Sequence, residues 1–204
     1  MNAQGQRYLD NIKVQGHGSV LEHATVSLHL YGISRSLTHE LVRHRAGFAI
    51  SQLSQRYVDG RVLRFVMRSE FAADPELRRL AESQFDESAE LYERVAQDLL
   101  ARQEGGDTLL SGEAKRDRRK KVNQAAREML PNATETVMIW SGNMRGLRHV
   151  IEMRASEHAE VSINDLLLRI FLCLYVVDPI MFGDYQIRRL PDGRYAVETE
   201  YRKV

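Results

Sequence analysis

The segment "TETVMIWSGNMRGLRHVIEMR", residues 134–154, decides the fold because its hydrophobic pattern changes period halfway along. Residues 134–140 carry Thr, Val, Ile and Trp, the residue types that favour strands. Ser141 is predicted to cap a helix that begins near Asn143. The apolar stripe of this helix consists of Leu147, Val150 and Ile151. The segment therefore predicts a strand followed directly by an amphipathic helix.

Two cationic residues lie on the apolar stripe of this helix, which is expected over residues 143–161. Continuing the stripe by three, four and eight residues reaches Arg154 and His158. A buried guanidinium without a partner is strongly unfavourable, so Arg154 must meet a protein carboxylate or a ligand that is anionic or bears a carbonyl. Glu22 and Glu40 are candidate carboxylates. The helix alone leaves both alternatives open.

The other elements follow from hydrophobic periodicity and turn residues. Strands are expected over residues 24–33 and 61–67, and a helix capped by Ser34 or Ser36 is expected to stop at Gly47. Further helices are expected over about 75–103, from the Asp74-Pro75 start, over 112–130, ended by Pro131, and over 163–177. Residues 185–201 are two strand-like runs joined by Asp192-Gly193, a hairpin signal.

The mixture of elements predicts the fold class. Helices dominate and the strands are few, which favours an α+β fold of mixed helices with a small, antiparallel-rich sheet. We find no internal repeat, low-complexity tract or linker rich in Gly, Pro or Ser. Residues 1–204 are therefore expected to form a single domain.

Composition excludes several classes of protein. The 204 residues include 29 Lys and Arg against 28 Asp and Glu, and this balance argues against a general nucleic-acid coat. The single cysteine, Cys173, excludes an intrachain disulfide or a Cys-rich metal site. Its apolar neighbours "IFLCLYVV" (170–177) predict a buried, unreactive thiol. No signal sequence or membrane span is evident, so we expect a soluble, cytoplasmic protein.

Common metal and nucleotide motifs are absent from the sequence. "HELVRH" (39–44) is close to a zinc-protease helix, but its second histidine follows the first by five residues and lies about 140° away around the helix. The seven histidines show no clear ligand spacing, so we expect no metal site. Without a Gly-rich phosphate loop, a nucleotide must be held by side chains and isolated loops.

Positive charge is concentrated in "RHRAGFAISQLSQRY", residues 43–57. Its guanidinium groups are planar forks suited to phosphate or flavin oxygens, and its amides and hydroxyls are neutral donors. These residues are Arg43, Arg45, Arg56, Gln52, Ser54 and Gln55. "KRDRRKK" (115–121) is typical of a solvated helix face, whereas Arg127 lies near a turn where it can face a phosphate. As a bare pattern, a surface basic patch would contain the same residues.

"RHR" followed by "SQLSQRY" closely resembles the signature of the flavin-dependent thymidylate synthases, which is usually R-H-R, seven residues, Ser, and then R-Y two residues later. Two further blocks resemble the same family, "GHGSVLEHATVSLHLYGISRSLTHELVRHR" (16–45) and "AAREMLPNATETVMIWSGNMRGLRHVIEMRASEHAEV" (125–161). The resemblance extends from about Tyr8 to Asp184.

The resemblance implies a homotetramer with FAD sites shared between subunits. It implies reduction and methylation of C5 of a uridine monophosphate, with methylenetetrahydrofolate as carbon donor and NADPH as reductant. Flavin contacts then fall on Ser19, Glu22, Arg43, His44, Arg45, Gln52, Asn143, Arg145 and His149. Nucleotide contacts fall on Glu40, Arg43, Gln52, Ser54, Gln55, Arg56, Arg127 and Arg154.

Within that set the resemblance implies catalytic roles for Arg154 and Ser54. Arg56 and Arg127 would clamp the 5′-phosphate. Arg154 would face the pyrimidine and stabilise negative charge as N3 ionises, which makes C5 electron-rich. The family's mechanism uses no cysteine nucleophile, in agreement with the setting predicted for Cys173.

Two departures from the family pattern stand out. Eight residues, "AGFAISQL" (46–53), replace the usual seven, and Gly47, Phe48 and Ala49 replace polar positions. We expect this altered loop to change the sugar pocket or loosen substrate choice, so that UMP is accepted as well as dUMP. Only sixteen residues precede "HGSVLEH", which predicts a missing outer strand and a different sheet edge.

Three alternatives are left open. One is a UMP-preferring C5-methylase. Another is a nucleic-acid or nucleotide-binding protein that uses the basic clusters electrostatically, which predicts salt-sensitive binding and no yellow chromophore. The third is a flavoprotein that retains only NADPH oxidase activity or is catalytically idle. Flavin absorbance and product analysis separate these cases.

Overall fold

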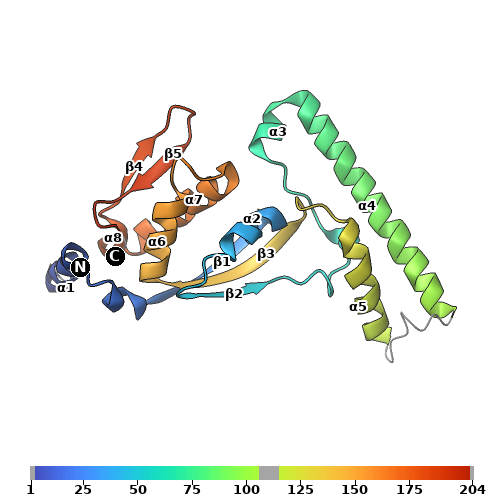
Figure 1. The fold of residues 1–204 in the computed structure, drawn as a ribbon, viewed down its shortest axis with the longest axis horizontal. Helices are drawn as coiled ribbons and strands as arrows, with labels where there is room; N and C mark the ends of the chain where they lie inside the picture. The colour runs from blue at the N-terminus through green and yellow to red at the C-terminus, as the bar shows by residue number, and fades with distance from the viewer. Residues whose placement is uncertain (1–2, 106–114, 203–204) are drawn as a thin grey trace. The chain divides into compact units, whose positions relative to one another are not determined.

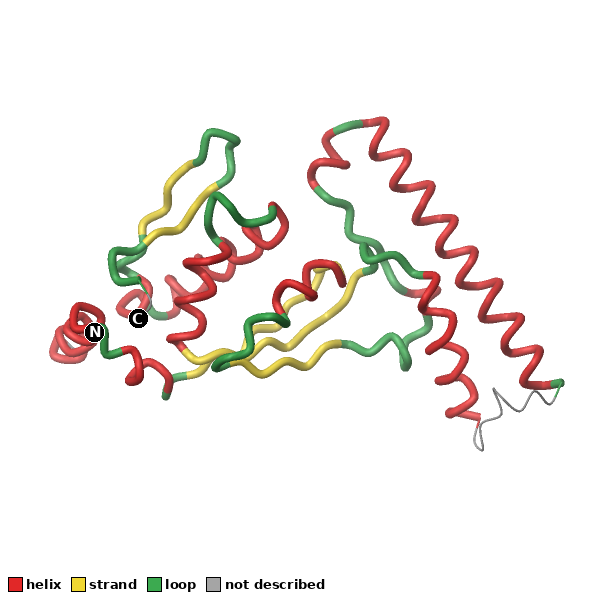
Figure 2. Tube along the Cα trace, in the orientation of Figure 1, coloured by secondary structure: helices red, strands yellow, loops and turns green. Residues whose placement is uncertain are grey.

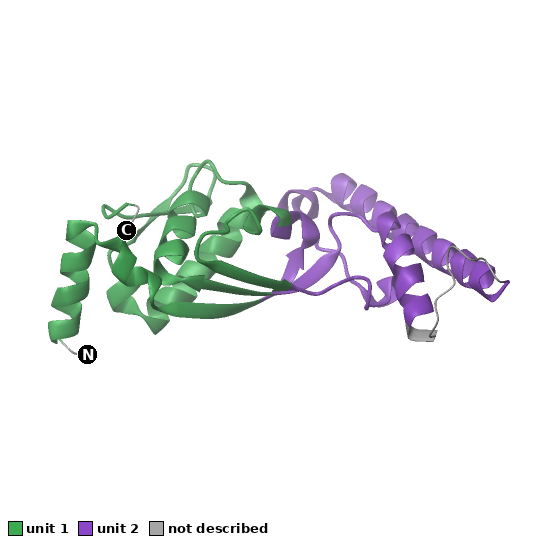
Figure 3. Cartoon of the chain, turned by 60° about the horizontal axis from the view of Figure 1, so that its bottom comes forward, with its two compact units in different colours: residues 1–29, 39–51, 139–204 green, residues 30–38, 52–138 purple. Residues whose placement is uncertain are grey.

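The computed structural model describes residues 3–105 and 115–202 of the chain (Figure 1). The chain divides into two compact units, shown in different colours in Figure 3. Unit 1 comprises residues 1–29, 39–51 and 139–204, and unit 2 comprises residues 30–38 and 52–138. The expected α+β class is confirmed, and the single domain over residues 1–204 stays a prediction.

Three strands form one sheet in the order β1-β3-β2, and they are drawn in yellow in Figure 2. Their bounds are Thr25–Ser34 for β1, Phe48–Gln52 for β2 and Glu135–Asn143 for β3. Backbone bonds show the directions: Met144 N donates to Ala24 O at 2.9 Å, and Asn143 N donates to Gly47 O at 3.0 Å. At the other ends, Arg35 N donates to Thr134 O and Leu53 N to Val137 O. Both pairings are antiparallel, as predicted.

Unit 1 is built on helix α6, Met144–Arg154, and helix α7, Val161–Val177, which contact each other. Leu147, Ile151, Ile163 and Leu167 are fully buried. The unit also contains α1, Ala3–Gln15, the 3-10 helix η1, Gly18–Glu22, and α8, Pro179–Phe182. The predicted hairpin is confirmed as β4, Gln186–Arg189, paired with β5, Tyr195–Glu198, and Gly193 has a positive φ of 88° in the turn.

Unit 2 contains two packed helices, α4 over Pro75–Glu104 and α5 over Lys115–Ala126. The predicted start of α4 is confirmed, because Asp74 accepts hydrogen bonds from Glu76 N at 2.8 Å and Leu77 N at 3.1 Å. Shorter helices adjoin α4. They are η2, Gly60–Val62, α3, Ser69–Ala73, and η3, Arg127–Met129.

Two predicted elements around the sheet differ in the structure. Residues 61–67 do not form a strand, because Gly60 N donates to the Tyr92 hydroxyl at 2.9 Å and this bond holds the segment on α4 as a 3-10 turn. One isolated bridge, Phe65 to Thr134, remains. The helix expected to stop at Gly47 is the shorter α2, Arg35–Leu41, and its cap is Ser34, whose Oγ accepts from Leu37 N at 3.1 Å.

The environment of Cys173 also differs from the prediction. Cys173 is exposed, although Phe171 and Leu174 beside it are buried. The apolar run covers the whole circumference of α7, so its hydrophobicity does not tell which side faces the core. Leu172, Tyr175 and Val176 are exposed on the same helix. Within residues 3–105 and 115–202, no helix is long and apolar enough to span a membrane.

Candidate functional site

The site in unit 1 begins at the N-terminus of α6, which is capped by Asn143. Asn143 Oδ1 accepts a hydrogen bond from Gly146 N at 2.8 Å. Ser141, the predicted cap, lies inside β3, and its Oγ is 2.7 Å from Ser27 Oγ. The cap prediction was wrong because pairing with β2 and β1 extends β3 by two residues beyond Ser141.

A tight turn brings the segment after the "RHR" motif against this cap. Phe48 N donates to Arg45 O at 3.2 Å, and Gly47 has a φ of 77°. A Cβ at Gly47 would lie 2.5 Å from Asn143 Nδ2, so glycine is required by space as well as by conformation. The Phe48 ring stacks on Trp140 with centroids 4.5 Å apart. The segment 46–53, expected to be a loop, is therefore a turn followed by strand β2.

Arg154 lies at the C-terminal end of the apolar face of α6, as predicted. Its side chain is 24% exposed, whereas Leu147, Val150 and Ile151 are buried. Arg154 Nη1 is 3.3 Å from Glu40 Oε2, and Arg154 Nε donates to His44 Nε2 at 3.1 Å. The carboxylate partner expected from the sequence is thus Glu40. Among the described residues, nothing hydrogen-bonds to Arg154 Nη2.

The surroundings of His44 favour its neutral form. Partial burial lowers the pKa of His44, and the charges of Arg154 and His149 lower it further. Neutral imidazole has one lone-pair nitrogen, which here accepts the Arg154 Nε–H. His44 and Glu40 together orient the guanidinium.

His158 does not belong to this cluster, contrary to the prediction. Helix α6 ends at Arg154, and the side chain of His158 is 88% exposed. The chain leaves the helix after Ala155, whose carbonyl accepts from Val197 N at 2.7 Å. Pairing with the C-terminal hairpin therefore ends the helical register that would have carried His158 inward.

The other predicted flavin contacts in unit 1 are mostly exposed. Arg145 Nη1 is 2.5 Å from Glu22 Oε1, and a Cβ at Gly18 would meet Arg145 Nε at 2.7 Å. Exposed side chains are those of Ser19, Arg43, Arg45, Arg145 and His149. This set of guanidinium, imidazole and amide donors fits an anionic dinucleotide such as FAD.

Unit 2 carries neutral donors at the end of β2 and directly after it. Gln52 Nε2 donates to Thr38 Oγ1 at 3.2 Å and to Thr136 Oγ1 at 3.3 Å. Ser54 is half-buried. Gln55 is only 7% exposed, and its Nε2 has no partner among the described residues. A buried amide donor without an acceptor is unfavourable, which makes Gln55 a candidate donor to a ligand.

The charge of Arg127 acts on a second arginine, Arg35, that sequence reasoning missed. Burial lowers the pKa of Arg35, and the charge of Arg127 lowers it further. The carboxylate of Glu128 approaches Arg127 only to 3.8 Å. The sequence does carry a signal for Arg35: it is the first residue of α2, where the helix dipole disfavours a cation.

Arg56 lines a basic pocket of unit 2. Its Cζ is 5.6 Å from the centre of the Tyr57 ring, and Arg118, Arg119 and Lys120 line the same pocket. Arg127 is not among the residues described as lining this pocket. A common phosphate clamp by Arg56 and Arg127 stays a prediction, as does convergence with Arg154, which belongs to unit 1.

The basic run 115–121 is only partly the solvated face that we expected. Arg119 and Lys121 are exposed, but Arg118 and Lys120 are half-buried. The side chains of residues 115 and 116 lie outside the described part of the chain.

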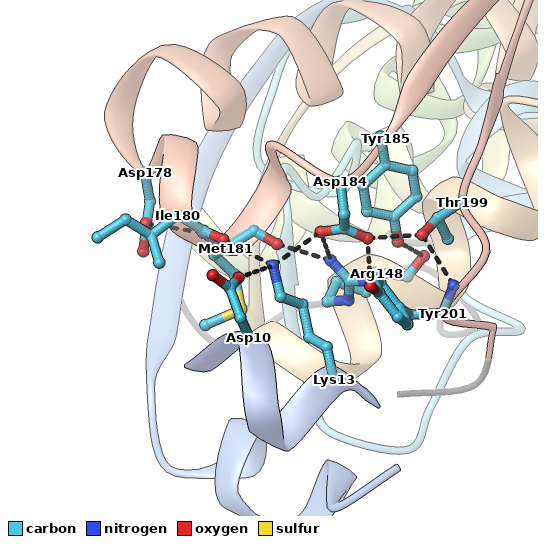
Figure 4. Close-up of polar contacts among 10 residues, drawn as sticks. All are labelled: Asp10, Lys13, Arg148, Asp178, Ile180, Met181, Asp184, Tyr185, Thr199 and Tyr201. Atoms are coloured by element: carbon cyan, nitrogen blue, oxygen red, sulfur yellow. Dashed lines mark hydrogen bonds and ion pairs between the residues drawn. The ribbon is translucent and has the colours of Figure 1, made fainter. Parts of the chain in front are cut away.

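A buried ionic cluster lies on another side of α6 (Figure 4). Arg148 is fully buried, and its Nη1 and Nη2 each lie 2.8 Å from an oxygen of Asp184. Lys13 Nζ is 3.3 Å from Asp184, and Thr199 Oγ1 donates to it at 2.5 Å. Sequence reasoning missed Arg148, although it follows the buried Met144 by one helical turn.

Comparison with known proteins identifies the family. A family model described as "Thymidylate synthase complementing protein" matches residues 1–180. The flavin-dependent thymidylate synthase of Mycobacterium marinum is 46% identical over 186 residues, covering 91% of this chain and 72% of that protein. The Corynebacterium glutamicum protein of the same name is 41% identical over 199 residues, covering 98% and 77%. The predicted resemblance and the methyltransferase class of enzyme are confirmed, and the chain belongs to the flavin-dependent thymidylate synthase family.

Proposed function

We propose that the protein converts dUMP to dTMP by reductive methylation at C5. In this proposal FAD is bound, methylenetetrahydrofolate donates the carbon and NADPH is the reductant. The names of the relatives support the reaction class. The observation that carries the proposal is Arg154, a guanidinium oriented by Glu40 and His44 with its Nη2 left for a ligand.

Arg154 is the catalytic residue of this proposal. Its Nη2 would donate to the pyrimidine and stabilise negative charge as N3 ionises, which raises electron density at C5. His44 supports this role because a neutral imidazole accepts the Nε–H without repelling the guanidinium. Ser54 would lie beside the same nucleotide as a neutral donor.

The phosphate of the nucleotide requires several donors. The charge of Arg127 disfavours the charged form of Arg35, and a bound phosphate would reduce this repulsion. Each guanidinium can give two hydrogen bonds to a phosphate. The unpaired Nε2 of Gln55 would add a neutral donor. We propose that Arg56 and Gln52 complete this set.

FAD would be held by the exposed donors of unit 1. When bound, the flavin supplies the reducing hydride. Arg43, Arg45 and Arg145 would bind its anionic part, and His149 and Asn143 would complete the contact. Ser19 and Glu22 lie on η1, and Glu22 would orient Arg145 through their ion pair.

Replacement of Arg154 by Ala tests the proposal. We expect turnover to fall by about a hundredfold to a thousandfold, the range for loss of a charge-stabilising donor, while bound flavin absorbance changes little. The matched control is Arg169→Ala, which removes an arginine paired with Asp165 on the exposed side of α7. Near-normal methylation by Arg154→Ala would refute the catalytic role.

We also propose that UMP is accepted beside dUMP. The support is the altered segment 46–53, in which Gly47 and Phe48 rebuild the turn next to Asn143. The test is kcat/KM for both nucleotides in parallel. A preference for dUMP of about a thousandfold, or roughly 4 kcal/mol, would contradict this part of the proposal.

We further propose a homotetramer in the cytoplasm, with FAD sites shared between subunits and one domain per chain. Sedimentation analysis with and without FAD measures the subunit number. A monomer that binds FAD fully would contradict shared sites.

A further inference from the structure

A basic pocket of about 670 Å³ lies in unit 2 between α4, α5 and the residues that follow β2. This volume lies within the range of small-molecule sites. The charged residues that line it are Arg56, Arg118, Arg119, Lys120 and Glu104. The lining of this pocket therefore contains four cationic side chains and one carboxylate.

These cations have no carboxylate partners of their own. Among the described residues, none of the four lies within ion-pair distance of an acidic side chain, although Arg119 contributes weakly to the low pKa of Asp59. Elsewhere on α4 the pattern differs, because Arg78 pairs with Glu82 at 2.9 Å and Arg102 with Asp98 at 2.8 Å. Unpaired like charges in a concave site repel one another, and an anion relieves that repulsion.

An aromatic ring lies within the same group of charges. Arg56 Cζ is 5.6 Å and Lys120 Nζ is 5.1 Å from the centre of the Tyr57 ring. Tyr57 is 55% exposed, so part of its surface is accessible. An accessible aromatic ring beside cations is the chemistry that binds a base together with its phosphates.

We propose that this pocket binds a nucleotide with more than one phosphate group, and that in the proposed reaction it takes the adenosine 2′,5′-bisphosphate end of NADPH. The identification of the reductant rests on the proposed function. Arg56 also belongs to the proposed site for the dUMP phosphate, so Arg118, Arg119 and Lys120 supply the positive charge that two phosphate groups require, and the Tyr57 ring supplies a surface for the adenine. The 2′-phosphate distinguishes NADPH from NADH, so the pocket would set that preference.

Binding of 2′,5′-ADP to the purified full-length protein tests the proposal directly. The variant Arg118→Gln/Lys120→Gln removes two lining charges and leaves Arg56 in place. The control Arg94→Gln/Lys121→Gln removes two exposed charges from the same helices outside the pocket. We expect wild type to bind 2′,5′-ADP at least about tenfold more tightly than AMP, and the pocket variant to lose about tenfold per charge-assisted contact. The control should stay within about threefold.

Kinetics separate this inference from the proposed function. We expect the pocket variant to raise KM for NADPH by about tenfold or more while KM for NADH and for dUMP changes little. A general structural defect would change all three. If the wild-type protein forms no dTMP, the proposed function fails. The 2′,5′-ADP titration still shows whether the pocket binds a nucleotide with more than one phosphate group.

Three results would overturn the inference. The first is that the wild-type protein binds 2′,5′-ADP no more tightly than AMP. The second is that the pocket variant binds 2′,5′-ADP with wild-type affinity. The third is tighter binding of a single-stranded oligonucleotide than of 2′,5′-ADP, lost in the same variant, which would identify a nucleic-acid site. Thermal unfolding checks that the double variant folds, and the single variant Lys120→Gln replaces it if it does not.

Discussion

Two arginines of α6, Arg148 and Arg154, are six residues apart and have opposite surroundings. Arg148 is fully buried, with both terminal nitrogens 2.8 Å from Asp184, and its Nη1 also donates to the carbonyl of Met181 at 2.6 Å. Arg154 is 24% exposed, with a single carboxylate contact at 3.3 Å to Glu40. Both terminal nitrogens of Arg148 are occupied by protein, whereas Nη2 of Arg154 has no hydrogen-bond partner among the described residues.

The difference in how the terminal nitrogens are occupied is a criterion that distinguishes an arginine with a structural role from one that is a candidate for ligand binding. The terminal nitrogens of Arg148 are occupied by a bidentate, buried pair that a ligand would have to break, although Arg148 Nε has no hydrogen-bond partner among the described residues. A guanidinium held loosely by one carboxylate and one imidazole is oriented but still available. The pKa of Asp184 is low because Arg148 and Thr199 bond to it despite burial, whereas His44 beside Arg154 has a lowered pKa because of burial and nearby cations.

The largest expected effect is on stability, from Arg148→Met. The substitution leaves Asp184 buried with only Lys13 and Thr199 as partners, and breaking a buried pair costs about 3–5 kcal/mol of unfolding free energy. Urea unfolding measures it. The double variant Arg148→Met/Asp184→Leu should recover most of the loss, because it removes both charges. A loss below about 1 kcal/mol in the single variant would contradict the structural role of the Arg148–Asp184 pair.

Substitution by lysine separates the roles of Arg148 and Arg154 more sharply, because lysine keeps the positive charge but lacks the planar guanidinium that gives two parallel hydrogen bonds. Arg154→Lys should lower kcat/KM for dUMP by about a hundredfold, or roughly 2.7 kcal/mol, with little change in Tm. Arg148→Lys should lower Tm and leave kcat/KM per folded molecule close to wild type. The reverse pattern, with activity lost only in Arg148→Lys, would contradict the assignment.

The sequence predicts much of this helix but not its partners. The β3–α6 succession and the apolar stripe are confirmed, because hydrophobic period is a local property. Glu40 was one of two carboxylates expected for Arg154. Asp184 was not anticipated, since it lies 36 residues from Arg148 and is brought there by packing of α8. Periodicity identifies a buried face, and only the tertiary structure supplies its partner.

The errors of prediction have a common physical cause. Ser141 and Asn143 are both good cap residues, and strand pairing, which is non-local, decides between them. Strand β2 was missed because Gly47 interrupts the apolar run before Phe48. His158 was assigned to α6 because the pattern continues past its end, although a bond from Val197 stops the helix at Arg154. Convergence of Arg56, Arg127 and Arg154 stays a prediction.

Gly47→Ala tests the start of the helix that carries both arginines. Alanine at a φ of 77° is strained, and its Cβ would displace the capping side chain of Asn143. We expect a loss of about 2 kcal/mol in unfolding free energy, part from the left-handed conformation and part from the cap. The control is Gly193→Ala, also at positive φ but with no atom within 4 Å of the new Cβ, which should lose only about 1 kcal/mol. Equal losses would show that the Asn143 contact contributes nothing.

The smallest expected effect is a pH dependence that belongs to Arg154 and not to Arg148. The folded-state pKa of His44 lies below its ordinary value of 6.5, so the unfolded chain binds a proton more readily than the folded one. The His44 contribution to stability is therefore complete above about pH 6.5 and is lost as pH falls below it. Asp184 acts in a different window, because its pKa is depressed from 3.8 and its contribution is lost only in stronger acid. Urea unfolding between about pH 5 and 8 should show a decline on the acid side for wild type that is weaker in His44→Gln, whereas equal slopes would mean that Arg154 does not depend on a neutral imidazole.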